Sequence, residues 1–221
     1  MGRLKVIFCI PGNQFSMNFI QSWTNLISDL PKLDIEYECM WSYNPNIYRV
    51  RNGLLGGNPN FGKNQKPFNG TLDYDYIMWI DSDMVFKPTD FEKLISHDVD
   101  IVSGAYFVKP EDSMDIPFIF ACLKETIDNR PVPLTTLDIS NKNNLIEVEG
   151  NGMGFMLVKR GVFENMKYPW FEPYDISNDI ISDFESEDIS FQVKARKNGY
   201  KSYVDPNIIL GHEKSIILEL N

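Results

Sequence analysis

The chain has 221 residues, of which 43% are hydrophobic and 24% charged, and it includes 4 Trp, 10 Tyr and 15 Phe. This composition excludes a disordered, collagenous or coiled-coil protein and favours a single domain with one sizeable core. The formal net charge of −10 disfavours nucleic acid as a partner. No apolar run approaches the roughly 18 residues of a membrane span, so we expect a cytoplasmic protein with no membrane span.

Predicted strands and helices alternate along the first half of the chain. The continuous apolar run over 4–10 is typical of a strand that is buried on both faces of a parallel sheet. Apolar residues three and four apart predict an amphipathic helix over 16–30, with Ser16 as its N-cap. Shorter patterns predict strands at 35–41, 76–80 and 101–107, and helices at 47–55 and from Thr89.

The segment from Gly56 to Gly70 interrupts this alternation. It consists mainly of Gly, Asn, Pro and Lys, and only Phe61 and Phe68 are apolar enough to anchor it. Loops of this length are usually functional or disordered, so a lid over a bound ligand is one hypothesis for it.

The second half of the chain is less regular. Short patterns predict strands around 118–124 and at 155–158, 201–205 and 208–212, a short helix from Arg160, and a longer helix over 186–198 that ends at Gly199. Strands that alternate with helices predict an α/β fold. We therefore expect one Rossmann-like domain with a mostly parallel central sheet and helices on both faces.

Two carboxylates follow the predicted strand at 76–80, in the tripeptide Asp81-Ser82-Asp83. Residues two apart in an extended chain project to the same side, so the two carboxylates can share one cation. Ligands of open α/β sheets also bind outside the carboxyl ends of the strands. The simpler interpretation, in which the two aspartates only open a turn, remains an alternative.

A second acidic pair, Glu187-Asp188, follows Ser186 at the start of the predicted helix over 186–198. The helix dipole stabilises carboxylates in the first turn, so these residues could simply cap the helix. The same dipole keeps a carboxylate ionised, and an ionised carboxylate held rigidly there could take a proton from a hydroxyl group.

The third feature is Gly211-His212-Glu213-Lys214, which follows the last predicted strand. An isolated histidine is more often structural than a ligand, and His97 fits that interpretation. His212 differs because it follows a strand and a glycine, and because Lys214 accompanies it.

These features, in this order, resemble the GT-A class of nucleotide-sugar-dependent glycosyltransferases. In that class an aspartate-any-aspartate motif ends a central strand, an acidic pair opens a later helix that ends in a glycine-aromatic turn, and a histidine follows the last strand. The resemblance covers nearly the whole chain and is greatest to small soluble glycosyltransferase domains of large algal DNA viruses, which implies a location in the host cytoplasm. It implies a nucleotide-binding half over 1–110 and an acceptor-side, catalytic half over 111–221.

The resemblance also implies a role for each motif. The implied metal ligands for Mn2+ or Mg2+ are Asp81, Asp83 and His212, with diphosphate oxygens completing the shell. The implied catalytic residues are Asp188 and Glu187. The implied donor-binding residues are Pro11, Gly12, Asn13, Arg51, Asp81, Ser82, Gly152 and Lys214. The segment from Gly150 to Phe155, followed by Arg160, is similar to the glycine-rich segment under the donor sugar.

The function that this resemblance implies is a metal-dependent transfer of a sugar from a nucleoside-diphosphate sugar, in particular a UDP-sugar, to a hydroxyl of a glycan or glycoprotein acceptor. A sugar nucleotidyltransferase and a non-catalytic module that binds nucleotide-sugars or carbohydrates are the alternatives. The loop after the first strand lacks the basic, glycine-rich signature of a nucleotidyltransferase and the Gly-x-Gly-x-x-Gly of a NAD-linked enzyme. Gly62-Lys63-Asn64 lacks the Ser or Thr of a P-loop.

Overall fold

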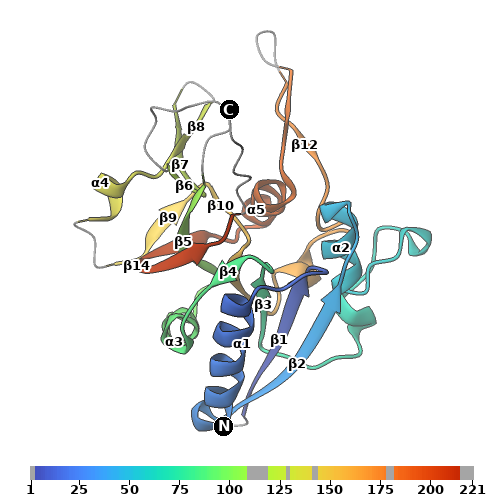
Figure 1. Ribbon diagram of the computed structural model, residues 1–221. Coiled ribbons are helices and arrows are strands. Elements are labelled where there is room, and N and C mark those ends of the chain that lie inside the picture. Colours follow the sequence, from blue (N-terminus) through green and yellow to red (C-terminus); the bar gives the residue numbers. More distant parts are fainter. Residues whose placement is uncertain (1–2, 109–118, 128–129, 141–143, 178–181, 215–221) are drawn as a thin grey trace, which may run out of the picture.

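A computed structural model describes residues 3–108, 119–127, 130–140, 144–177 and 182–214 (Figure 1). Its central sheet has the strand order β2-β1-β3-β11-β5-β14-β4, with two further strands, β6 and β9, paired to β5 and β14. In that order the seven strands are Ile35–Ser42, Leu4–Pro11, Tyr76–Ile80, Phe155–Lys159, Ile101–Val108, Ser202–His212 and Met84–Val85. The two additional strands are Ile119–Phe120 (β6) and Ile146–Val148 (β9).

The sheet is mostly parallel, as predicted, but one central strand is reversed. β1 pairs in parallel with β2 and β3, and β14 pairs in parallel with β5. β11 lies between β3 and β5 and is antiparallel to both. The beginning of β11 therefore lies at the same edge of the sheet as the ends of β1, β3 and β5.

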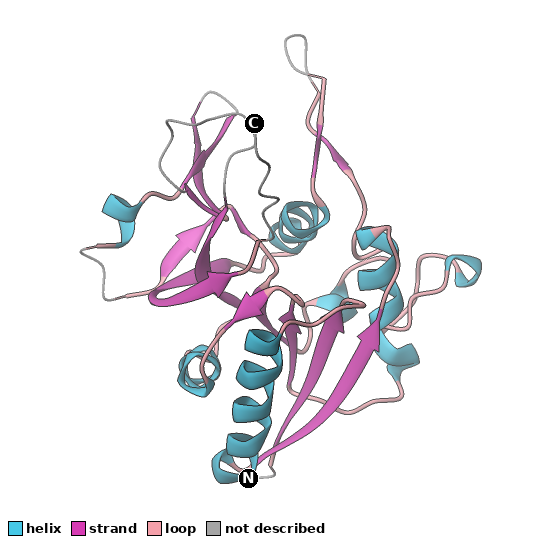
Figure 2. Cartoon of the chain, viewed as in Figure 1, coloured by secondary structure: helices cyan, strands magenta, loops and turns pink. Residues whose placement is uncertain are grey.

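Helices cover both faces of this sheet, which confirms the predicted α/β architecture (Figures 1 and 2). On one face, α1 (Met17–Asp29) and α3 (Pro88–Ser96) share a core cluster with β1 and β3. On the other, α2 (Ile47–Leu54) and α5 (Glu187–Lys197) share a second cluster with the same strands. The alternation of side chains along β1 shows this division, since Phe8 belongs to the first cluster and Ile7 and Cys9 to the second.

Two smaller β structures stand beyond the edge at which β3 ends (Figure 1). One is a three-stranded sheet of β10 (Gly150–Asn151), β7 (Cys122–Ile127) and β8 (Arg130–Pro133). The other is a hairpin of β12 (Tyr174–Asp175) and β13 (Phe184–Glu185). The remaining short helices are α4 (Thr136–Ile139) and 3-10 turns at Leu30–Leu33, Pro59–Phe61, Pro67–Gly70 and Phe163–Asn165.

Most element boundaries agree with the sequence patterns, and the exceptions have local causes. The Ser16 side chain accepts a hydrogen bond of 3.0 Å from the Phe19 amide, so the predicted cap of α1 is confirmed. The two predicted C-terminal strands are one strand, β14, whose register shifts between Asp205 and Ile209. Only the 3-10 turn at Phe163–Asn165 forms where a short helix from Arg160 was expected.

The loop over 56–70 lies against the segment over 163–170. The Tyr168 amide donates to the Lys63 carbonyl at 3.0 Å, and Lys167 Nζ donates to Asn64 Oδ1 at 2.7 Å. Phe68 is 7% exposed and anchors the loop, but Phe61 is 66% exposed, so its expected anchoring role is wrong. Because these bonds attach the loop to 163–170, the contacts give no support to the lid hypothesis.

Within the described ranges, no helix combines the length and the apolar character that crossing a membrane requires.

The two phenylalanines of this loop make a matched test of the fold. Phe68→Ala should lower the free energy of unfolding by about 3 kcal/mol, because it removes a buried ring. Phe61→Ala should change that free energy by less than about 0.5 kcal/mol, because its ring is exposed. Urea denaturation measures both values, and equal effects of the two substitutions would contradict the described packing.

Candidate active site

The carboxyl ends of the strands bring most of the predicted site residues to one edge of the sheet. Asp81, Ser82 and Asp83 follow β3, and His212 ends β14. Two cavities meet there, of about 410 Å³ and about 510 Å³, and Asp83 and Lys214 line both. The smaller is also lined by Asp81, Gly152, Asp188 and His212, and the larger by Asn13, Ser82 and Glu213.

Arg51 is the charged residue behind this edge. It is 2% exposed, and its guanidinium joins three elements. Nη2 donates to Asp81 Oδ2 at 3.1 Å, and Nε donates to Glu187 Oε1 at 3.0 Å. Burial lowers the pKa of Arg51, but its two carboxylate partners more than offset this and raise the pKa overall. Arg51 therefore remains charged and holds the end of β3 against the start of α5.

This ion pair leaves two polar atoms unused. Arg51 Nη1 and Asp81 Oδ1 are buried and have no hydrogen-bond partner among the described residues. Burial raises the pKa of Asp81, and Arg51 offsets this only in part. Asp81 Oδ1 still lies 3.1 Å from Arg51 Nη2, at ion-pair distance. Buried polar atoms without partners are costly, so Arg51 Nη1 is suited to a ligand that supplies an acceptor.

Asp83 faces two nitrogen atoms. Its Oδ2 lies 3.0 Å from His212 Nε2 and 2.9 Å from Lys214 Nζ. Burial alone would raise the pKa of Asp83, but the hydrogen bonds from His212 and Lys214 dominate and lower it to about 2. The bond to Asp83 raises the pKa of His212, against the effect of burial.

The orientation of the His212 ring shows that this place favours a cation. Its Nδ1 lies 2.8 Å from the carbonyl oxygen of Phe107, which can only accept, so Nδ1 must carry a hydrogen. In the neutral ring Nε2 then presents a lone pair to the Asp83 carboxylate. That contact is repulsive unless a proton or a metal ion lies between them.

A divalent metal fits this pair of residues. A carboxylate and an imidazole suit Mn2+ at least as well as Mg2+, which prefers oxygen ligands. In the part of the chain that the structure describes, no three His, Cys, Asp or Glu side chains converge on one metal position. Asp83 and His212 would thus hold the ion with ligand or water oxygens. The predicted role of Asp81 as a third ligand stays a prediction, since Asp81 is paired with Arg51.

The two residues of the second acidic pair, Glu187 and Asp188, have different surroundings. Asp188 lines the 410 Å³ cavity, and its Oδ1 accepts hydrogen bonds from the Ser186 hydroxyl and, at 2.8 Å, from the Ile189 amide. Burial, with repulsion by Glu187, raises the pKa of Asp188 to about 6. The pKa of this group is therefore higher than its place at the start of a helix predicts, because burial outweighs the dipole, although the carboxylate stays mostly ionised at neutral pH. Glu187 is 8% exposed and faces Arg51 instead of the cavity.

Close backbone approach explains two glycines of the site. A Cβ atom at Gly12 would lie 2.6 Å from Ser82 Cβ, so the loop of Pro11, Gly12 and Asn13 can touch the turn after β3 only with glycine there. A Cβ atom at Gly152 would lie 2.0 Å from the Tyr106 hydroxyl oxygen. At both glycines the missing side chain lets a neighbour, Ser82 or Tyr106, pack directly against the backbone.

Sequence patterns missed three contributors to this site. Tyr106 lines the smaller cavity, the Phe107 carbonyl orients His212, and Glu213 binds Ser16 and Asn18 at the start of α1. Tyr106 and Phe107 lie near the end of β5. They could have been found by the rule that located Asp81, namely that ligands of open α/β sheets bind at the carboxyl ends of the strands.

Arg160, which was expected beside the glycine-rich segment, lies at the opposite edge of the sheet. It follows the end of the reversed strand β11 and pairs with Asp73. The antiparallel direction of β11 is the reason for this error.

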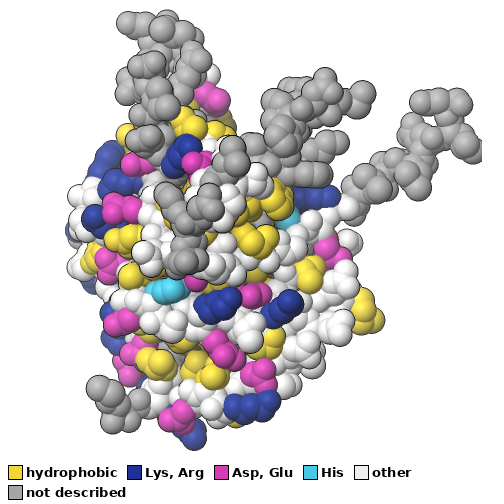
Figure 3. Space-filling view, turned by 90° about the vertical axis from the view of Figure 1, so that its left-hand side faces the viewer, with side chains coloured by type: hydrophobic (Ala, Val, Ile, Leu, Met, Phe, Trp, Pro, Cys, Tyr) yellow, Lys and Arg dark blue, Asp and Glu magenta, His cyan; other side chains and the backbone are white. Residues whose placement is uncertain are grey.

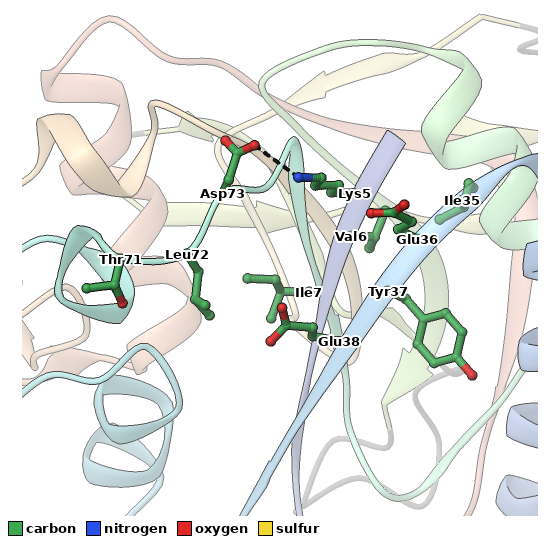
Figure 4. A pocket seen from close by; sticks show the side chains of 10 residues that line it. All are labelled: Lys5, Val6, Ile7, Ile35, Glu36, Tyr37, Glu38, Thr71, Leu72 and Asp73. Carbon is green, nitrogen blue, oxygen red and sulfur yellow. Dashed lines mark hydrogen bonds and ion pairs between the residues drawn. The ribbon is translucent and has the colours of Figure 1, made fainter. Parts of the chain in front are cut away.

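A third cavity, of about 510 Å³, lies at that opposite edge (Figure 4). Ile7 and Leu72 form its apolar part, Glu36 and Glu38 line its β2 side, and Lys5 is paired with Asp73. It has neither the carboxylate–imidazole pair nor the strand ends of the first two cavities. On the face in Figure 3, acidic and basic side chains are interspersed, without an extended basic patch.

Comparisons with known proteins support the fold. No model of a known protein family matches the sequence, and no curated protein matches it by sequence. Among solved structures, A197 from STIV is similar with a TM-score of 0.53 and 20% identity, covering 99% of this chain and 98% of that one.

Two glycosyltransferases are also similar. A Drosophila β1,4-galactosyltransferase 7 mutant, in complex with manganese, UDP-Gal and xylobiose, has a TM-score of 0.50 and 12% identity over 96% of this chain and 71% of that one. GalNAc-T7 with UDP, GalNAc and Mn2+ has a TM-score of 0.57 and 11% identity over 95% of this chain and 43% of that one. The chain therefore has a GT-A-like fold, and identities this low say nothing of its substrates.

The buried bridge of Arg51 can be tested by stability. Arg51→Met should lower the free energy of unfolding by about 3–5 kcal/mol, because it leaves two carboxylates without their partner. Lys32→Met removes an exposed ion pair with Asp29 and should cost less than about 1 kcal/mol. A similar small loss in both variants, measured by urea denaturation, would show that the bridge does not hold α2, β3 and α5 together.

Proposed function

We propose that this protein is a metal-dependent glycosyltransferase that moves a sugar from a UDP-sugar to a hydroxyl group of an acceptor. The observation that carries the proposal is the pairing of the Asp83 carboxylate with the His212 imidazole, 3.0 Å apart at the carboxyl edge of the sheet, because these two groups can hold a divalent cation in place of the proton that they share. The cavities on either side of Asp83 provide room for a nucleotide and for a sugar. The fold similarity to two glycosyltransferases solved with UDP and manganese supports this function.

Each site residue has a proposed role in the reaction that follows from its position. Asp83 and His212 would hold the metal, which supplies positive charge to the leaving diphosphate. Lys214, whose side chain is 62% exposed, can move from Asp83 Oδ2 to a phosphate oxygen when the metal takes its place. Arg51 Nη1, which has no hydrogen-bond partner among the described residues, can bind a carbonyl or phosphate oxygen of the donor. These contacts explain how a chain with a net charge of −10 could bind an anion.

We assign to Asp188 the role of accepting the proton of the acceptor hydroxyl. It lines the same cavity as Asp83 and Gly152, and a base works best when its pKa lies near the working pH. With a pKa of about 6, Asp188 is mostly ionised at neutral pH and still binds a proton better than an ordinary aspartate does.

The metal assignment predicts a specific loss of nucleotide binding. Calorimetry should detect UDP binding in the presence of Mn2+ and little binding without it. Asp83→Ala should abolish the Mn2+ dependence, because it removes one of the two protein ligands. Asp73→Ala, which removes an exposed carboxylate far from the site, should leave the affinity unchanged. Unchanged affinity in Asp83→Ala would remove the assignment.

The base assignment predicts opposite effects on rate and stability. Asp188→Asn should lower turnover by about two to four orders of magnitude with UDP affinity nearly intact. Because the pKa of Asp188 is raised in the folded state, its stabilising effect is present below the unfolded pKa and is lost as the pH rises through about 6. The neutral Asn variant should therefore have a higher Tm than the parent at pH 7.

Two measurements check the role of Asp188. Turnover of the parent should fall as the pH drops below about 6, since the base becomes protonated. An Asp188→Asn variant with near-normal turnover would identify Asp188 as a helix cap only, and the protein as one that uses another base or only binds its ligand.

A further inference from the structure

The 410 Å³ cavity has two chemically different sides. Its charged side chains come from the ends of β3 and β14 and from Asp188. Its other side is formed by the end of β5, the small sheet and the first turn of α5. The lining side chains there are Val108, Phe120, Ala121, Leu123, Pro133 and Ile189.

The side chains of this second side cannot form hydrogen bonds with the hydroxyl groups of a polyhydroxylated ligand. None of its six side chains carries a hydrogen-bonding group, and Tyr106 is the described polar lining residue other than His212, Lys214 and the aspartates. The Tyr106 hydroxyl already accepts from the Gly154 amide at 3.1 Å. A sugar ring against this wall would lose the hydration of its hydroxyls without replacement, which is unfavourable.

The donor sugar is not the ligand that meets this wall. In the function proposed above, on which this inference rests, the diphosphate lies beside Asp83, His212 and Lys214. The sugar bonded to it must lie next to them, in the part of the same cavity that Asp81 and Asp188 line. The apolar wall then remains for the acceptor, on the side where Ile189 follows the proposed base.

We propose that the acceptor is a phenol, a hydroxyl group carried on an aromatic ring, held between the apolar wall and Asp188. The bond between C1 of the donor sugar and the diphosphate oxygen breaks, and UDP leaves with the electron pair. The phenolic oxygen forms the new bond to C1, and its proton goes to Asp188. Leu123 and Pro133, which are partly exposed and line the cavity, offer apolar surface that suits an aromatic ring.

The acidity of the acceptor also favours a phenol over an alkyl alcohol. A phenolic hydroxyl such as that of tyrosine has a pKa near 10, so its proton passes to a carboxylate more readily than that of an aliphatic alcohol. The phenol can be free or can belong to a tyrosine side chain, since the cavity recognises the ring and its hydroxyl.

The test compares acceptors of matched size. Turnover is measured with Mn2+ and the UDP-sugar that raises the Tm of the protein most, and the acceptors are 4-methylphenol, N-acetyltyrosine amide, 4-methylcyclohexanol and a methyl glycoside. We expect kcat/KM for a phenol to exceed that for the saturated alcohol and the glycoside by about tenfold or more. Preference for N-acetyltyrosine amide over 4-methylphenol would identify a peptide as the source of the phenol. Preference for the glycoside or the saturated alcohol would overturn the proposal.

Variants of the wall connect that preference to this surface. Leu123→Asn should raise KM for 4-methylphenol by about tenfold and leave the calorimetric affinity for UDP with Mn2+ unchanged. Leu4→Asn, at an exposed leucine of β1, is the matched control and should change neither value. Val108→Thr, which is nearly isosteric, repeats the test without loss of packing volume. An unchanged KM for 4-methylphenol in both wall variants would overturn the proposal. If the parent protein did not bind UDP in the presence of Mn2+, that result would instead contradict the glycosyltransferase function.

Discussion

The arrangement of this site depends on one buried cation, Arg51. Its guanidinium is bonded to Asp81 at the end of β3 and to Glu187 at the start of α5, so three elements distant in sequence meet at one charge. A buried charge is tolerated only with partners, and these partners are themselves site residues. The same contact positions Asp188, which follows Glu187, opposite the turn that carries Asp83. Structural stability and the geometry of the site thus rest on the same ion pair.

A second constraint is the excess of negative charge at this edge. Asp81, Asp83, Glu187 and Asp188 gather within one region of a chain whose net charge is −10. Arg51 neutralises the inner part, while His212 and Lys214 face Asp83 at the outer part. The raised pKa of Asp188 is a direct result of burial and of this crowding. A divalent cation would relieve the outer part of the repulsion, which explains how an acidic protein could take a nucleoside diphosphate as its ligand.

The sequence predicted the fold class, and it located most residues of the candidate site, because both follow from local patterns. Apolar runs located β1 and β3, and Asp81, Asp83 and His212 were found as polar residues directly after strands. What the sequence could not provide are properties of the assembled structure. The reversed direction of β11 placed Arg160 at the wrong edge, and burial raised the pKa of Asp188 against the helix dipole. The different exposure of Phe61 and Phe68, two similar residues of one loop, depends on packing against 163–170 that no pattern encodes.

The central claim is that Asp83 and His212 together hold a divalent metal at the carboxyl edge of the sheet. Anomalous diffraction from crystals grown with Mn2+ and UDP, collected near the manganese absorption edge, tests it most directly. The account predicts a single strong anomalous peak about 2 Å from an Asp83 carboxylate oxygen and from His212 Nε2, with Lys214 displaced toward a phosphate oxygen. A manganese peak elsewhere, with the 3.0 Å contact between Asp83 and His212 intact, would contradict it.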